Sequence, residues 1–276
     1  MLLLGCACEF INPEESLPAY LHIADAQIQL DKQFYSKLGV KDVWLENGNA
    51  FVGVYQLPAS IPLFVEEKSN IIIRGGVFLN GLSAQRRAYP FWQPLSLGLE
   101  TQPLDTFRLS PTFSYFPDSL LRFPFIESFE GASLKLVNNS PAGQAARLQL
   151  TRNTVFQGRA SGHVRFDAQA SSFEAVSGDF FALPQENGAE VYAEITYSND
   201  IPFSAGLKFA SALETGERAE PIFFNSGLQW QTIYLYLTPL IQTAPAGSAF
   251  GLFIRAEGEG KTGDLFLDNI RLIHFK

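Results

Sequence analysis

The strictest constraint on the fold is a strand-like alternation, clearest in the segment GAEVYAEITYSND at residues 188–200. Apolar side chains recur at every second position, so that Val191, Ala193 and Ile195 face one side of an extended chain. Glu194 and its polar neighbours at even positions face the other side. A helical period of 3.6 would scatter both sets around an axis. The segment therefore predicts a half-buried β-strand.

The same period recurs through the second half of the chain. It is found in PFSAGLKFA (202–210), WQTIYLYLTP (230–239), AFGLFIRAEG (249–258) and GDLFLDNIRLIHF (263–275). Turn residues separate these segments, and eight to ten such strands suggest two packed antiparallel sheets. We expect a β-sandwich domain over residues 118–276.

The first half also lacks helical patterning. DVWLENGNAFVGVYQLP (42–58) predicts a hairpin around Asn47-Gly48, because this pair accepts the backbone angles of tight hairpin turns. NIIIRGGVFLNGLS (70–83) adds another strand and a second Asn-Gly pair. Residues 21–117 are therefore predicted to be a small β-sandwich-like domain. Both domains are all-β, and Pro117 and Pro124 stiffen the predicted boundary.

Composition limits the partners. The net charge is −8, which argues against a nucleic-acid-binding face. Hydrophobic residues make up 46% and charged residues 17%, enough for a large buried core. No run of about 20 apolar residues predicts a membrane-spanning helix. We expect contact with a membrane through a lipid anchor only.

The opening LLLGCACEF predicts that anchor. Leu3, Gly5 and Cys6 match a lipobox, in which an apolar residue lies three positions before the modified cysteine and a small residue directly before it. Residues 1–20 would then form an anchor stub and tether, with Cys6 lipidated and the protein held at the cell envelope or outer-membrane surface. The alternative is a core strand with a chance Gly-Cys pair. It stays open, because only four residues precede Gly5, too few for the basic and apolar regions of a signal peptide.

Aromatic side chains supply the candidate binding face. Tyr234 and Tyr236 are out of phase with the apolar set of their strand and are expected on its outer face, where rings stack on sugars. Tyr89 and Trp92, in the loop 86–92, are the second candidates. The alternatives are core packing for the tyrosines and packing at the domain junction for the loop. Trp230 is predicted to be a core residue.

Four segments in order carry a family resemblance: FIESFEG (125–131), GRASGHVRF (158–166), LQWQTIYLYL (228–237) and GDLFLDNIRL (263–272). Together they resemble the jelly-roll, galactose-binding-like domains of carbohydrate-binding modules. The resemblance implies a jelly-roll fold over about residues 121–276 and non-catalytic glycan binding.

The same resemblance implies a structural calcium ion. In such modules an acid of the first strand and an acid of the last strand help to hold Ca²⁺, and Glu127, Glu130 and Asp268 occupy those places. The alternative is that the three are surface acids or turn caps.

The first half has a resemblance of its own. The hairpin segment 42–58 and GGVFLNGLSAQRRAYPFW (75–92) resemble small β modules of Gram-negative envelope lipoproteins. This likeness implies a location and no activity.

Enzyme signatures are absent: there is no G-x-S-x-G, H-E-x-x-H or P-loop. His22, His163 and His274 stand singly in strand-like contexts. We therefore predict a non-catalytic, lipid-anchored surface protein that binds glycan or another extracellular ligand. The alternative is a structural subunit of an outer-membrane complex that packs on protein partners. A glycoside hydrolase is a third option, because acids cluster at 214–220 and 257–259, although in turn-like stretches.

Overall fold

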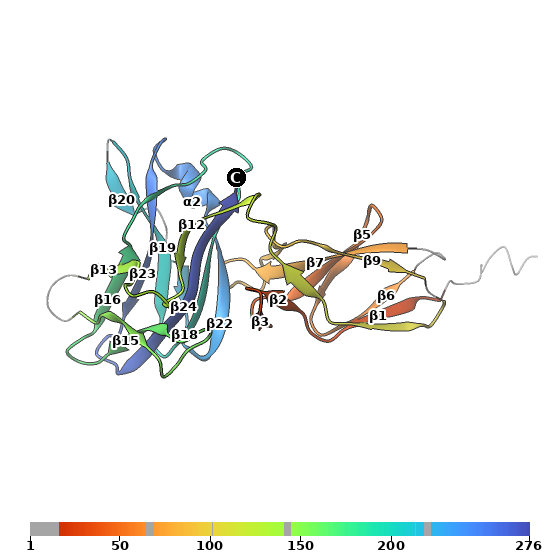
Figure 1. Cartoon of the computed structure of the whole chain (residues 1–276), viewed down its shortest axis with the longest axis horizontal. Coiled ribbons are helices and arrows are strands. Elements are labelled where there is room, and N and C mark those ends of the chain that lie inside the picture. The colour runs from red at the N-terminus through yellow and green to blue at the C-terminus, as the bar shows by residue number, and fades with distance from the viewer. Residues whose placement is uncertain (1–16, 65–68, 101, 141–144, 213, 218–221) are drawn as a thin grey trace, which may run out of the picture.

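The computed structural model describes residues 17–64, 69–100, 102–140, 145–212, 214–217 and 222–276. Within this part the regular secondary structure is almost entirely β-strand, which confirms the predicted all-β class; the helix found there is α2 (Thr238–Thr243). No helix of the described chain is long and apolar enough to cross a bilayer. Two β-rich bodies lie side by side along the long axis (Figure 1). The predicted anchor residue Cys6 lies outside the described residues.

The N-terminal unit contains three sheets. Their orders are β10-β1-β6, β11-β2-β3 and β5-β4-β7-β8, with β9 also paired to β7. The predicted hairpin is present, since Asn47 pairs with Ala50 across a turn in which Gly48 has a φ of 58°. The strands are β1 (Ala19–Ile23), β2 (Gln27–Gln29), β3 (Tyr35–Ser36), β4 (Asp42–Asn47), β5 (Ala50–Gln56), β6 (Ala59–Leu63), β7 (Ser69–Phe78), β8 (Arg86–Ala88), β9 (Leu95–Leu99), β10 (Thr106–Leu109) and β11 (Thr112–Ser114).

The C-terminal sandwich contains two packed sheets. We call β14-β15-β24-β18-β22, with β12 paired to β24, the front sheet, and β13-β16-β23-β19-β20, with β17 and β21, the back sheet. The strands are β12 (Leu121–Glu127), β13 (Leu136–Asn138), β14 (Leu148–Thr151), β15 (Ser161–Phe166), β16 (Ser172–Ser177), β17 (Phe181–Ala182), β18 (Val191–Asn199), β19 (Phe203–Ala210), β20 (Thr215–Glu217), β21 (Ile222–Phe224), β22 (Gly227–Tyr236), β23 (Ala249–Glu257) and β24 (Gly263–Phe275).

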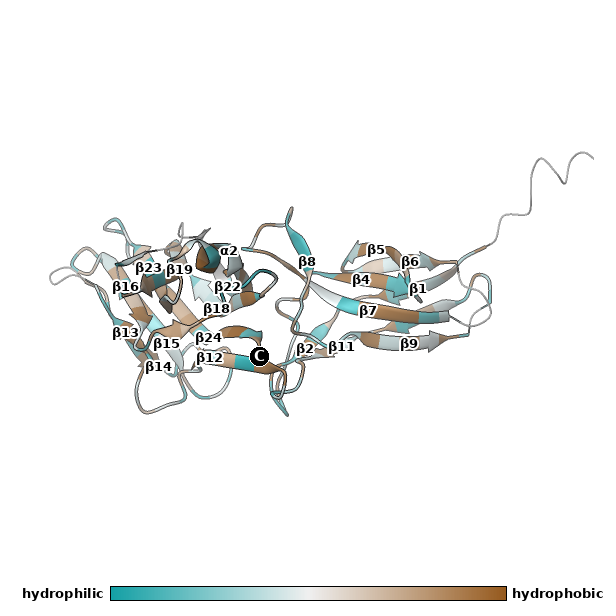
Figure 2. Cartoon of the chain, turned by 90° about the horizontal axis from the view of Figure 1, so that it is seen from above, coloured by the Kyte–Doolittle hydropathy of each residue, from teal (hydrophilic) through white to brown (hydrophobic). Residues whose placement is uncertain are grey.

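Strand β18 shows how the two bodies fit together. Val191, Ala193 and Ile195 point into the core between the two sheets, as their alternation predicts. The opposite side of the strand is buried as well, so that every residue from 191 to 199 is buried. The outward-facing Tyr192 belongs to the same apolar cluster as the core of the N-terminal unit. The N-terminal unit therefore packs on the outer face of the front sheet, with β8 at the boundary (Figure 2).

Candidate functional site

The rings predicted to form a sugar-binding platform lie inside this junction. Tyr89, Trp92 and Tyr234 are 2%, 4% and 2% exposed. The Tyr89 and Tyr234 ring centroids are 4.7 Å apart, and Tyr236 lies half-buried under the Arg87 guanidinium. The expectation of an exposed platform is therefore wrong for this face. Tyr234 does lie on the outer face of its strand, as its spacing predicts, but the N-terminal unit covers that face.

A buried carboxylate crosses the junction. Tyr89 donates a hydrogen bond to Glu194 Oε1 at 2.6 Å, and Tyr115 donates one to Oε2 at 2.8 Å. Arg271 Nε lies 3.4 Å from the same Oε2, as an ion pair without hydrogen-bond geometry. Burial, together with the charge of Glu194, raises the pKa of both phenols. The cluster holds the sandwich and the N-terminal unit in one arrangement.

Trp230 corrects a second expectation. Ile233 and Leu235 point into the sandwich, and Tyr197, another core residue, pairs with Gln231. Inward positions of β22 are thus odd-numbered, and Trp230 points outward. Its ring is half-buried rather than in the core. The period of two contained this information, because residue 230 is in phase with 232 and 234.

Trp230 belongs to a run of half-buried rings on the open part of the front sheet, which we call the aromatic row. Its ring centroid lies 5.7 Å from that of Phe156 and 6.5 Å from that of Phe266. His163 stacks on Phe266 at 4.6 Å with only 9° between the planes. Phe34 of the N-terminal unit meets Phe156 at the other end. Its rings come from β22, β24 and β15 and from loops at Phe156 and Phe34, and thus from distant parts of the sequence.

Polar groups border the aromatic row. Asp264 accepts hydrogen bonds from His163 Nε2 at 2.7 Å and from Arg165 Nη1 at 2.5 Å. Although burial opposes it, these two contacts hold the pKa of Asp264 below its usual value. The Arg165 side chain is about half exposed. Charged donors and acceptors thus lie beside apolar ring surface, as sugar hydroxyls and C–H faces require.

Two of the predicted calcium ligands hold a loop in place. Asp268 Oδ2 accepts hydrogen bonds from the main-chain N–H groups of Phe156 and Gln157, at 3.2 and 3.1 Å. Glu130 Oε1 accepts from the main-chain N–H groups of Arg159 and Ala160, at 2.7 and 3.0 Å. The two acids therefore fix residues 156–160 against the front sheet and place Phe156 in the aromatic row. Burial, with the nearby charge of Glu130, raises the pKa of Asp268 to about 6.

This arrangement does not fit a calcium ion. Glu127 is engaged elsewhere, by the N–H groups of Phe129 and Lys135 at 2.8 and 2.5 Å. N–H donors thus occupy oxygens of all three carboxylates, where a cation needs oxygen ligands that converge on it. Within the described part of the chain, no group of three or more His, Cys, Asp or Glu side chains is placed to hold a metal ion. These acids act here as turn and loop anchors.

We expect metal chelation to leave the protein's stability unchanged. Because main-chain N–H groups already satisfy Glu130 and Asp268, neither excess EDTA nor excess Ca²⁺ is expected to move the thermal midpoint by more than about 1 °C. Thermal unfolding followed by circular dichroism measures this. A rise of several degrees on adding Ca²⁺, reversed by EDTA and absent in Asp268→Asn, would restore the calcium interpretation.

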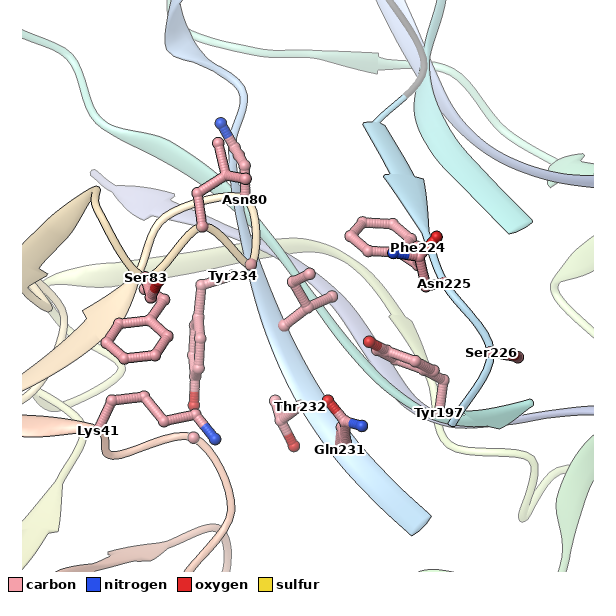
Figure 3. Close-up of a pocket in the computed structure, with 15 residues that line it drawn as sticks. Lys41, Asn80, Ser83, Tyr197, Phe224, Asn225, Ser226, Gln231, Thr232 and Tyr234 are labelled. Carbon is pink, nitrogen blue, oxygen red and sulfur yellow. The ribbon is translucent and has the colours of Figure 1, made fainter. Parts of the chain in front are cut away.

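A pocket opens beside the aromatic row, between the two bodies (Figure 3). Its volume is about 460 Å³, and both bodies line it. Asn80 connects the walls: its main-chain N–H donates to Tyr234 O at 2.9 Å, and its Oδ1 accepts from the N–H of Tyr236 at 3.0 Å. Lys41 enters from the N-terminal unit, and β22 lines the pocket with residues from both of its sides, among them Gln231 and Thr232. Sequence reasoning missed this pocket, although the second Asn-Gly pair at 80–81 marked its turn.

Comparisons with known proteins identify no family for the chain. No family model matches it, and no curated protein matches it. Solved structures similar to it include a family 30 carbohydrate-binding module of the cellulosomal cellulase Cel9D-Cel44B of Clostridium thermocellum, with a TM-score of 0.42, 11% identity, and coverage of 55% of this chain and 96% of that one. A CBM22-1 xylan-binding domain of Paenibacillus barcinonensis Xyn10C has a TM-score of 0.36, 14% identity, and coverage of 56% and 96%.

A third similar structure covers most of the chain. It was described in work on the promiscuous specificity of carbohydrate-binding modules of the β-sandwich superfamily. It has a TM-score of 0.43 and 12% identity, and the match covers 94% of this chain and 99% of that one.

Proposed function

We propose that the protein is a non-catalytic glycan-binding protein whose site is the aromatic row on the open part of the front sheet. The observation that carries the proposal is the row itself. Trp230 and Phe266 offer apolar ring surface to one side of the sheet, bordered by Asp264 and Arg165. A pyranose presents an apolar C–H face to such rings and hydroxyls to the polar border.

The aromatic row is held in a fixed geometry, which favours specific glycan binding over nonspecific hydrophobic adsorption. Phe156 sits on a loop that four main-chain hydrogen bonds to Glu130 and Asp268 hold in place. His163 is oriented by Asp264. Ligand binding to such a preordered face loses little conformational entropy. The direct test is a glycan-array screen of the full chain, repeated with Trp230→Ala.

The alternative, a subunit of an outer-membrane complex, predicts a broad apolar patch for a protein partner. An apolar region of the front sheet's outer face, around Tyr192 and Tyr234, is instead covered by the chain's own N-terminal unit. For this reason the glycan-binding proposal is preferred. Exposed Glu257 and Glu259 are solvated charges at the end of β23, which gives no support to a hydrolase.

We also propose that Cys6 carries a lipid anchor at the envelope surface. Support comes from the lipobox pattern and from exposed apolar side chains where the described chain begins. Leu17 is 57% exposed, and Phe64 and Leu104 are 65% and 62% exposed. The three lie at one end of the sheet β10-β1-β6, since Leu63 pairs with Ala19 and the Leu104 N–H donates to Pro18 O. An apolar end beside the tether suits a membrane surface.

Mass spectrometry of the native N-terminus tests the anchor. We expect a chain that begins at Cys6 and carries acyl groups, because a lipobox cysteine becomes the first residue after processing. Conversion of Cys6 to Ser is expected to release the protein from the membrane fraction. A native, unmodified peptide running through Met1 to Glu9 would rule the anchor out, and it would leave the glycan-binding proposal untouched.

A further inference from the structure

Beside the pocket, two glycines of the N-terminal unit pack closely against β22 of the sandwich. Gly39 has a φ of 102° and approaches Tyr234 so closely that a Cβ atom there would lie 2.3 Å from the Tyr234 hydroxyl oxygen. A Cβ on Gly81 would lie 2.8 Å from Ile233 Cδ1. Only glycine permits both approaches. These contacts bring Lys41 and the turn at residues 80–83 to the edge of β22.

The charged side chain that lines the pocket is a cation, Lys41. Among the lining residues that the structure describes, Lys41 is the only ionisable amine or acid, and the remaining polar groups are hydroxyls and amides. Its main chain is fixed, because its N–H donates to Gly76 O and its C=O accepts from the Leu57 N–H. No carboxylate of the described chain forms an ion pair with its ammonium group, which is half-buried. Because burial removes part of the water around the ammonium group, it lowers the pKa of Lys41.

Hydrogen-bonding groups face the lysine. In Figure 3 the Lys41 side chain reaches in beside Tyr234. Thr232 lies on the same side of β22 as Tyr234, whereas Gln231 and Tyr197 line the pocket from the other side of that strand. The Lys41 ammonium group and the Thr232 hydroxyl can both donate hydrogen bonds to a carboxylate in the pocket. A cation that entered the pocket would meet the charge of Lys41 and would find no carboxylate among the described lining residues. The chemistry of the lining therefore favours an anion.

The pocket is continuous with the proposed sugar platform. Thr232 lines the pocket and points to the same side of β22 as Trp230. Two residues along a strand span about 7 Å. One short oligosaccharide can therefore stack a ring on Trp230 and extend a substituent into the pocket. The net charge of −8 would repel a polyanion, which favours a mostly neutral glycan with a single acid group.

We propose that this pocket binds the carboxylate of a uronic acid residue borne by a glycan that stacks on the aromatic row, with Lys41 as its ion-pair partner. This inference rests on the proposed glycan-binding function and adds the class of glycan to it. Both bodies contribute to the site, so the N-terminal unit takes part in recognition and not only in support.

The test uses the full chain and a matched pair of probes. One is a neutral xylo- or gluco-oligosaccharide bearing one glucuronic acid side group, and the other is its carboxyl-reduced form. Isothermal titration calorimetry is expected to show tighter binding of the acidic probe by about tenfold, the value of one charge-assisted hydrogen bond. Lys41→Met is expected to remove that preference while keeping affinity for the reduced probe. Lys32→Met, at an exposed lysine of the same unit, is the control and is expected to keep the preference.

The possible failures are distinguishable. Equal binding of both probes by the unaltered protein, or a preference that survives Lys41→Met, overturns the inference and leaves the proposed function standing. Absence of binding to these probes and to every glycan of an array overturns both. Salt titration of the unaltered protein gives a second measurement that does not depend on a folded variant. Added salt is expected to weaken binding of the acidic probe alone, and an equal effect on both probes counts against Lys41.

Discussion

Replacing Glu194 by alanine is expected to lower the free energy of unfolding by about 3–5 kcal/mol. The carboxylate is 3% exposed and accepts hydrogen bonds from Tyr89 and Tyr115 while facing Arg271. Its removal leaves the largely buried Arg271 guanidinium without its counter-charge, and the hydroxyls of Tyr89 and Tyr115 without an acceptor. Equilibrium denaturation of the full chain, followed by tryptophan fluorescence and circular dichroism, measures the loss.

Two further variants test the cause. Glu194→Gln keeps the volume and one acceptor and is expected to lose less than Glu194→Ala, because hydrogen bonding survives in part. Glu257→Ala removes an exposed glutamate of the same sandwich and is expected to change the free energy of unfolding by no more than about 0.5 kcal/mol. A loss below about 1 kcal/mol for Glu194→Ala would mean that this cluster does not hold the junction together.

Replacing Trp230 by alanine is expected to weaken glycan binding by at least about tenfold, which is 1.4 kcal/mol. The indole is the largest ring of the aromatic row, and its truncation removes both its own stacking surface and the neighbour of Phe156 and Phe266. The glycan found by array screening is titrated into both proteins by calorimetry. The expected difference lies in affinity, with the stoichiometry unchanged.

Matched variants separate this effect from loss of fold. Phe51→Ala removes a ring that is 62% exposed on the N-terminal unit and is expected to leave affinity unchanged. Trp230→Phe is expected to retain part of the binding, because an aromatic face remains. If Trp230→Ala binds as tightly as the unaltered chain while its thermal midpoint is preserved, the site lies elsewhere.

The strands could be predicted because their signal is local. A period of two follows from the geometry of an extended backbone, so Val191, Ala193 and Ile195 identify a strand face without reference to the rest of the fold. The hairpin at residue 48 was predicted for the same reason, since a turn is a property of a few consecutive residues. The phase of Trp230 was also available, and its assignment to the core contradicted the pattern of its own strand.

The candidate site could not be predicted in this way. Alternation separates the two faces of a strand, but it does not say what covers the outer one. Tyr234 and Trp230 share a face of β22, yet the first is buried by the N-terminal unit and the second is half-open. Asp268 is a similar case, because its hydrogen-bond partners at residues 156 and 157 are about 110 positions away in the chain. Nothing near either residue encodes these partners.

By itself, the sequence determined the all-β class, the strand faces and the acidic charge, since each depends on residue type and short-range spacing. Tertiary structure alone decided which part of the front sheet stays open. It also decided that Glu130 and Asp268 accept hydrogen bonds from the main chain of residues 156–160. It also brought Lys41 to the edge of β22. The physical reason is that burial and charge pairing are set by contacts between segments far apart in the chain, and those contacts exist only once the N-terminal unit has packed on the sandwich.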